Sequence, residues 1–261
     1  MTLIISVLTW GKVLQVSDRR LFNTDTGTSE DDHSNKMITM PCLDASLSIA
    51  YTGLAKVGSP MLGTVDWLTN SLNNMDSPTL TINDIRVQLS REWRKVMSMT
   101  PIHRSLAGLT SSIVIAGFFR IGEPFALRIH SNRTDEFFQA NIKKKSKLCA
   151  VVIDGQDPFN EQDAIGKELG KRIKKLRRKR YFQKNTKEDG VKELVSLIRA
   201  TQLGPYGKFI GTNCLGISIV PHPTLIGNFV INSEYYGEEY RDYWGPYHTH
   251  ISEHGIIGSP D

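Results

Sequence analysis

The chain opens with two short apolar segments joined by a turn, a pattern that predicts a β-hairpin. Residues 2–9 are mostly apolar and β-branched, Trp10-Gly11 can turn, and residues 12–17 alternate between two faces. The polar, acidic stretch at residues 23–34 is typical of a loop. Further strands are predicted near Met37 and over residues 46–52, 111–119, 124–130, 147–153, 215–220 and 227–232.

Four amphipathic helices are predicted between these strands, in two pairs. In the first pair, one helix is expected to begin at Ser59 with Pro60 in its first turn, and the other at a cap near Thr81. The second pair follows the apolar stripes of residues 165–176 and 191–198. The order of strands and helices lacks the regular alternation of a doubly wound fold, and it favours sheets covered by pairs of helices.

The length fits one large domain or two small ones, no linker between domains is evident, and the composition suits a fold without disulfides. The chain has 261 residues, of which 39% are hydrophobic, and its three cysteines show no metal-ligand spacing, which suits a reducing compartment. The apolar start lacks the basic region of a signal peptide, and residues 113–119 fall short of the roughly 20 residues that span a bilayer. We therefore expect a cytoplasmic protein with no membrane association.

The net charge of +5 is concentrated in two basic runs, residues 143–145 and 171–180. The second run could contact nucleic acid. However, Ile173 and Leu176 continue the apolar stripe of the third helix, so the basic side chains fit its solvent-exposed face better. A nucleic-acid partner is therefore not expected.

The last segment, residues 235–261, is rich in Tyr, Gly and His and is expected to be an irregular extension. Its string His248, His250 and His254 could ligate a metal, but no carboxylate motif accompanies it. Its aromatic residues suit the covering of an apolar surface or a neighbouring subunit. No metal and no cofactor are expected.

Four features near the start of the chain resemble proteasome β-subunits and their bacterial ring-protease relatives, which are N-terminal-nucleophile hydrolases. Thr2 opens an apolar strand, Asp18 and Arg20 follow at the family's spacing, Lys36 follows Asn35, and Gly53 stands before the first helix. The resemblance implies an α+β fold over residues 1–234, a four-layer αββα sandwich of two mostly antiparallel sheets covered by helix pairs.

The resemblance also implies a role for each of these residues. Once Met1 is removed, the α-amine of Thr2, whose ordinary pKa is roughly 8, can take the proton of the Thr2 hydroxyl. Lys36 would keep that amine unprotonated, Asp18 would hold Lys36, and Arg20 would buttress Asp18. The Gly53 N–H would stabilise the developing oxyanion.

These roles imply a threonine-type amide hydrolase, a peptidase or amidase, that acts through an acyl-enzyme on Thr2. The alternative is a non-catalytic structural or binding subunit of the same fold. It stays open because Asp154-Gly155-Gln156 stands where active relatives carry Gly-Ser-Gly, and Gly211-Thr212-Asn213-Cys214 stands where a second Asp and Ser are expected. The expected partners are a peptide or amide substrate and further copies of the chain; the sequence identifies no ATPase partner.

Overall fold

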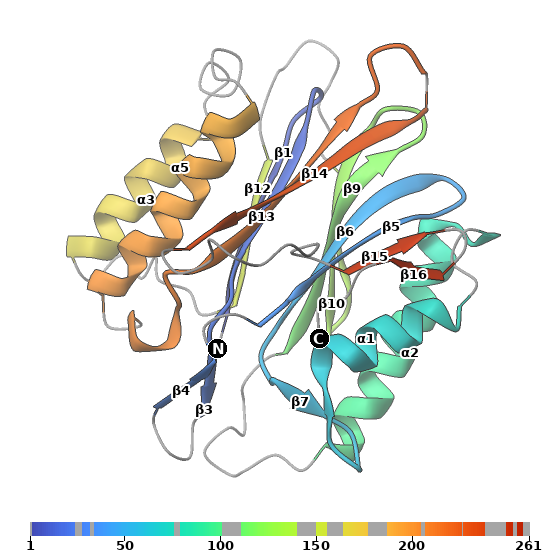
Figure 1. The fold of residues 1–261 in the computed structure, drawn as a ribbon, viewed down its shortest axis with the longest axis horizontal. Coiled ribbons are helices and arrows are strands. Elements are labelled where there is room, and N and C mark those ends of the chain that lie inside the picture. Colours follow the sequence, from blue (N-terminus) through green and yellow to red (C-terminus); the bar gives the residue numbers. More distant parts are fainter. Residues whose placement is uncertain are drawn as a thin grey trace.

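The computed structural model describes residues 2–23, 28–31, 34–75, 79–100, 111–139, 150–155, 164–176, 187–204, 207–225, 227–237, 249–252 and 255–257. Two sheets dominate (Figure 1), and every strand pair within them is antiparallel except β5 with β15. The prediction of an α+β protein with two mostly antiparallel sheets is therefore confirmed.

The first sheet has five strands, and the predicted opening hairpin lies at its centre. In order across the sheet they are β12 (Ala150–Gly155), β1 (Leu3–Leu8), β2 (Val13–Asp18), β13 (Cys214–Pro221) and β14 (Phe229–Tyr236). The β1–β2 turn is closed by the Thr9 N–H, which donates to the carbonyl oxygen of Lys12 at 2.9 Å. Every residue of β1 and β2 is buried, because both faces of this sheet are covered.

The second sheet has seven strands. In order they are β11 (Glu136–Gln139), β10 (Pro124–His130), β9 (Ser112–Phe119), β6 (Ala45–Thr52), β5 (Met37–Pro41), β15 (Thr249–Ser252) and β16 (Gly255–Ile257). The extension after residue 235 thus contains regular strands, contrary to the irregular segment expected, and β14 already includes Tyr235 and Tyr236. The parallel pairing of Thr249 with Ile38 joins β15 to the sheet.

Three apolar clusters hold the sheets and helices together. Between the sheets, Ile4 and Leu8 pack with Met37 and Val114. The other face of the first sheet packs against α3 (Ala164–Leu176) and α5 (Lys187–Ala200), and that of the second sheet against α1 (Thr64–Asn73) and α2 (Ile82–Met99). Figure 1 shows the two helix pairs on opposite sides of the molecule.

The start of α2 follows the sequence prediction, whereas the start of α1 does not. Thr81 caps α2 in a reciprocal capping box with Asp84. In contrast, α1 begins at Thr64, and Ser59-Pro60 lies in the turn between two short strands, β7 (Lys56–Val57) and β8 (Leu62–Gly63). The helix does not extend back to Ser59, because the Thr64 N–H donates to the carbonyl oxygen of Ala55 at 2.8 Å instead of to a residue of the preceding turn.

The remaining elements are short. β3 (Leu21–Asn23) and β4 (Thr28–Asp31) form a small hairpin. β4 lies within the stretch at residues 23–34 that was expected to be a loop, whereas β3 reaches it only at Asn23. Two 3₁₀ helices, η3 (Thr201–Leu203) and η4 (Gly207–Phe209), lead from α5 to β13. Within the described ranges, no helix is both long enough and apolar enough to cross a membrane.

Candidate active site

Thr2 and Lys36 come from the starts of two strands in different sheets and meet between the sheets. The Lys36 Nζ donates a hydrogen bond to the Thr2 Oγ1 at 2.8 Å. The exposed fractions of the two residues are only 1% and 3%. A buried ammonium group is therefore hydrogen-bonded to the hydroxyl that the sequence predicts to be the nucleophile.

Asp18, the last residue of β2, provides the negative charge beside this ammonium. Its Oδ2 lies 3.5 Å from the Lys36 Nζ, and the residue is fully buried. Its Oδ1 also accepts a hydrogen bond from the Leu3 N–H at 2.7 Å. The carboxylate therefore links the strand that follows Thr2 to the lysine that contacts it.

Two further main-chain groups complete the surroundings of Asp18. Its Oδ2 accepts hydrogen bonds from the Arg20 N–H at 3.1 Å and from the Gly211 N–H at 3.2 Å. A side chain at position 211 would collide with Arg20, because a Cβ there would lie 2.9 Å from the Arg20 Cβ. The polar segment before β13, where a second Asp was expected, instead supplies a backbone donor, which no local pattern in the sequence predicts.

Two backbone groups of Arg20 contact the site. Its N–H reaches Asp18, and its carbonyl oxygen accepts a hydrogen bond from the Lys36 Nζ. Its guanidinium lies near the carbonyl oxygens of Lys208 and Ile210, with Nη1 at 3.3 and 3.5 Å from them. Arg20 was expected to buttress Asp18; its backbone N–H contacts Asp18, and its guanidinium contacts the segment before β13.

Gly53 lies at the same end of the seven-stranded sheet as Lys36. Lys36 directly precedes β5, Met37 of β5 pairs with Ala50 of β6, and Gly53 directly follows β6. Its φ of +102° lies in the left-handed region, and a Cβ there would come within 2.7 Å of the Ser111 Cβ. Both its backbone angle and its neighbour therefore require glycine.

Ser111 is a polar neighbour of this site that the sequence did not single out. Its hydroxyl is buried and makes no hydrogen bond to any described residue. An unpaired buried hydroxyl is unfavourable, so such groups call for a structural or functional explanation. A search for polar residues opposite Gly53 in the predicted sheet could have found it.

A second polar cluster bridges the sheets next to Gly53. The Thr52 hydroxyl donates to the Asp154 Oδ2 at 3.2 Å, and the Asp154 Oδ1 lies 3.1 Å from the Arg128 Nε. Arg128 also donates to the carbonyl oxygen of Ile153 at 2.5 Å. Asp154, which occupies the place of the expected Gly-Ser-Gly loop, thus contacts the residue before Gly53; Gln156 lies outside the described residues.

Cys214 lies opposite Asp18 in the pairing of β13 with β2. Burial, and next the negative charge of Asp18, raise the pKa of the Cys214 thiol. The thiol is therefore neutral at ordinary pH and a poor nucleophile.

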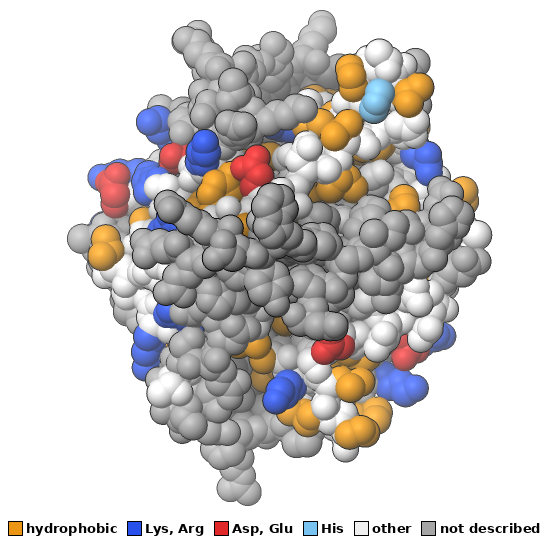
Figure 2. Space-filling view, viewed as in Figure 1, with side chains coloured by type: hydrophobic (Ala, Val, Ile, Leu, Met, Phe, Trp, Pro, Cys, Tyr) orange, Lys and Arg blue, Asp and Glu red, His pale blue; other side chains and the backbone are white. Residues whose placement is uncertain are grey.

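The charged surface is mixed. Figure 2 shows acidic and basic side chains interspersed over the described part of one face. In the described part of the basic run, Arg172 lies 3.0 Å from Glu193 and Lys171 lies 3.6 Å from Glu168, as on a solvated helix face. The described residues contain no group of three or more potential metal ligands, and the side chains of His248, His250 and His254 lie outside them.

The fold is similar to that of solved Anbu proteins. The chain matches Anbu from Hyphomicrobium sp. strain MC1 (a Gly-1 mutant) with a TM-score of 0.57 at 9% identity, covering 92% of this chain and 88% of that one. It matches Anbu from Yersinia bercovieri, described as an ancestral β-subunit, with a TM-score of 0.56 at 8% identity, covering 92% and 89%. The fold is therefore proteasome-like.

A third similar structure is the helical assembly of the Anbu complex from Pseudomonas aeruginosa. Its TM-score is 0.54 at 14% identity, and the match covers 92% of this chain and 88% of that chain. No protein-family model and no curated protein sequence matches the chain. At these identities the likeness shows the fold alone.

Proposed function

We propose that the protein is a threonine-type N-terminal-nucleophile hydrolase, a peptidase or amidase, that uses Thr2 after removal of Met1. The observation that carries this proposal is the 2.8 Å hydrogen bond from the Lys36 Nζ to the Thr2 Oγ1, with Asp18 3.5 Å from the same nitrogen. A hydroxyl that accepts a hydrogen bond from an ammonium is stabilised as negative charge develops on its oxygen.

The first chemical step needs a base. When Thr2 is the first residue, its α-amine can take the hydroxyl proton directly or through a water molecule. The nearby charge of Lys36 disfavours a second positive charge on that amine and so keeps it able to accept a proton. The Thr2 oxygen then attacks the substrate carbonyl and forms a tetrahedral intermediate. The carbon–nitrogen bond of the substrate breaks, and the substrate's amine leaves with the proton that the Thr2 α-amine had taken. Water then hydrolyses the resulting ester and frees Thr2.

The developing oxyanion needs a donor of its own. We assign this role to the Gly53 N–H, since Gly53 lies at the Lys36 end of the sheet and has a conformation that only glycine adopts without strain. One such donor is worth about 3 kcal/mol of transition-state stabilisation. Asp18 holds Lys36 in place and does not contact the substrate.

The fold also supports proposals about the domain layout, the self-association and the location of the protein. The three apolar clusters fit a four-layer αββα sandwich formed by one domain over residues 1–234. Residues 235–261 would be an extension, of which β15 and β16 add to the seven-stranded sheet. The solved helical assembly of a similar protein supports association of this chain with its own copies. The two described cysteines, Cys42 and Cys214, are free thiols, which fits a cytoplasmic location.

Covalent labelling tests the proposal. The purified protein is first weighed intact to establish that Met1 is absent, and is then treated with a β-lactone, whose strained ring acylates a hydroxyl without a leaving group. We expect the mass to rise by one probe, with the label on the peptide that begins at Thr2. Thr2→Ser should keep the labelling and Thr2→Ala should abolish it.

Thr9→Ala is a matched control, because Thr9 lies at the other end of β1 and its hydroxyl donates to the backbone of Lys12 at 2.8 Å. It should label like the wild type. Equal labelling of the wild type and Thr2→Ala, with Met1 demonstrably absent, would refute the hydrolase proposal.

That result would favour a non-catalytic subunit with the same fold. Asp154 favours this second function, since it occupies the place of the serine-bearing loop and is bound to Thr52 and Arg128. In that case the Thr2–Lys36–Asp18 contacts would serve to join the two sheets.

A further inference from the structure

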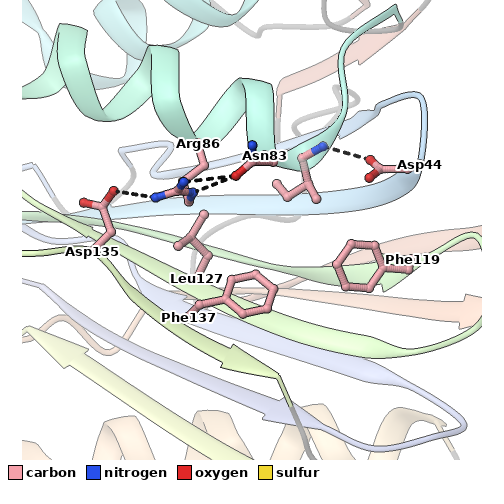
Figure 3. A pocket seen from close by; sticks show the side chains of 8 residues that line it. Asp44, Asn83, Arg86, Phe119, Leu127, Asp135 and Phe137 are labelled. Carbon is pink, nitrogen blue, oxygen red and sulfur yellow. Dashed lines mark hydrogen bonds and ion pairs between the residues drawn. The ribbon is translucent and has the colours of Figure 1, made fainter.

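A pocket of about 400 Å³ lies on the outer side of the seven-stranded sheet, between the first turns of α2 and strands β9 to β11 (Figure 3). It is separate from the Thr2 site. Its residue Asp44 lies beyond the far end of β5 from Lys36, so about 17 Å of extended strand separates the two. The volume lies within the range of about 300–1,000 Å³ that is usual for small-molecule sites.

The floor of the pocket is apolar. Figure 3 shows Phe119, Leu127 and Phe137 on the side of the sheet that faces α2. Phe119 and Phe137 flank the buried ring of Phe125, with centroid distances of 4.5 and 6.0 Å, so their positions are fixed by packing. Phe137 is 48% exposed although it is a large aromatic residue. A flat apolar ligand could cover this surface.

The two carboxylates that line the pocket are already engaged by the protein. Asp135 accepts hydrogen bonds from the Ser90 hydroxyl at 3.0 Å and from the Arg94 Nη2 at 2.7 Å. Asp44 accepts one from the Ile82 N–H at 2.8 Å, at the start of α2. The acidic groups therefore hold α2 in place, and they disfavour a ligand with several negative charges.

In contrast, donors remain available on the helix side. Arg86 directs Nε and Nη2 to the Asn83 Oδ1 at 3.3 and 3.0 Å, and Nη1 to the Asp135 Oδ2 at 3.5 Å. A guanidinium has five N–H groups, so two of them are not used within the described part of the chain. The same contacts point the oxygen of Asn83 at Arg86 and leave its amide nitrogen available as a further donor.

We propose that this pocket binds a small apolar monocarboxylate. Its flat body would lie on Phe119, Leu127 and Phe137, and its carboxylate would accept hydrogen bonds from Arg86 and Asn83. A guanidinium fork matches the geometry of a carboxylate, and the pairing gains strength from the charge on both groups. The site does not depend on the hydrolase proposal.

The test measures binding of two probes to the full-length protein by isothermal titration and by NMR chemical shifts. One probe is 3-phenylpropionate, and the other is its neutral amide, which has nearly the same shape. We expect the carboxylate to bind at least about tenfold more tightly than the amide. Phe137→Ala should weaken both probes, since it removes part of the floor they share.

Arg86→Gln should lower the affinity for the carboxylate to that for the amide. Arg91→Gln is the matched control, because Arg91 lies on the same helix, is 74% exposed and does not line the pocket; it should leave both affinities unchanged. Arg86→Lys keeps the positive charge but lacks the paired N–H groups of a guanidinium. Its affinity for the carboxylate should therefore lie between those of the wild type and Arg86→Gln. The proposal is overturned if neither probe binds at about 10 mM, a weak limit for a small ligand, or if Arg86→Gln binds the carboxylate as the wild type does.

Discussion

Replacing Lys36 by methionine tests the buried centre of the candidate site. The substitution keeps an unbranched side chain of similar length, so the packing changes little, while the positive charge and its donors are lost. Asp18 would then be a fully buried carboxylate with three backbone N–H partners and no counter-charge. The Thr2 hydroxyl would lose the hydrogen bond from Nζ.

The expected loss of stability is large because both members of the ion pair are buried. Removing one partner of such a pair usually costs about 3–5 kcal/mol, since the remaining charge stays out of water. A typical domain has a free energy of unfolding of about 5–15 kcal/mol, so the variant should remain folded but be clearly weakened. Activity or labelling at Thr2 should also fall in this variant, because the Thr2 hydroxyl loses its hydrogen bond from Lys36.

Urea unfolding, followed by circular dichroism, measures this effect as the change in the free energy of unfolding. Lys171→Met is the matched control, since Lys171 makes an ion pair with Glu168 but is 75% exposed. It should cost no more than about 1 kcal/mol. Adding Asp18→Asn to Lys36→Met should recover part of the loss, because the uncompensated charge is removed while an acceptor remains for the backbone donors.

A loss for Lys36→Met that is no greater than for Lys171→Met would refute this reasoning. It would mean that the Lys36–Asp18 pair is hydrated in solution or that the two residues are not in contact. A double variant with the summed cost of its two single changes would likewise contradict a direct interaction.

Two other outcomes are expected. Gly53→Ala should destabilise the protein by about 1–3 kcal/mol more than Gly122→Ala in thermal unfolding, because both glycines have positive φ but only at position 53 would the new Cβ press on Ser111. Equal losses would contradict the close packing of Gly53. The other outcome concerns Cys42, because burial raises the pKa of its thiol to about 12. The folded protein therefore favours the protonated thiol. The stabilisation that results is fully present below the unfolded pKa of about 8.5 and is lost as the pH rises from there towards the folded pKa. The urea concentration at the midpoint of unfolding should therefore fall less steeply with pH, between about pH 8 and 10, in Cys42→Ala than in the wild type. Equal slopes in the two proteins would contradict the raised pKa of Cys42.

Local patterns in the sequence predicted most of the strands and helices. Apolar residues recur with a period of 2 along a strand and of 3.6 along a helix, and both periods are clear where one face of an element packs on another element. The capping box of Thr81 and Asp84 involves residues three apart, so the sequence marks the start of α2 directly. Ser59-Pro60 carries an equally good local signal, but contacts to residues 54 and 55 hold Thr64 and decide where α1 begins. Such tertiary contacts are not visible in a local pattern.

The same distinction holds for the candidate site. Thr2 and Asp18 lie in one hairpin, where the register fixes their distance, so their spacing in the sequence was informative. Gly211 reaches Asp18 from 193 positions further along the chain, and Asp154 reaches Thr52 across 102 positions. No periodicity relates such residues, and only the folded chain brings them together.

The pairing of β15 with β5 affects the order in which the protein can be completed during synthesis. β5 leaves the ribosome well before residues 249–252, which pair with its outer edge. Until they arrive, β5 has an unprotected row of backbone donors and acceptors, which is a known starting point for pairing with other chains. A nascent or prematurely terminated chain should therefore depend on chaperones more than the finished protein does.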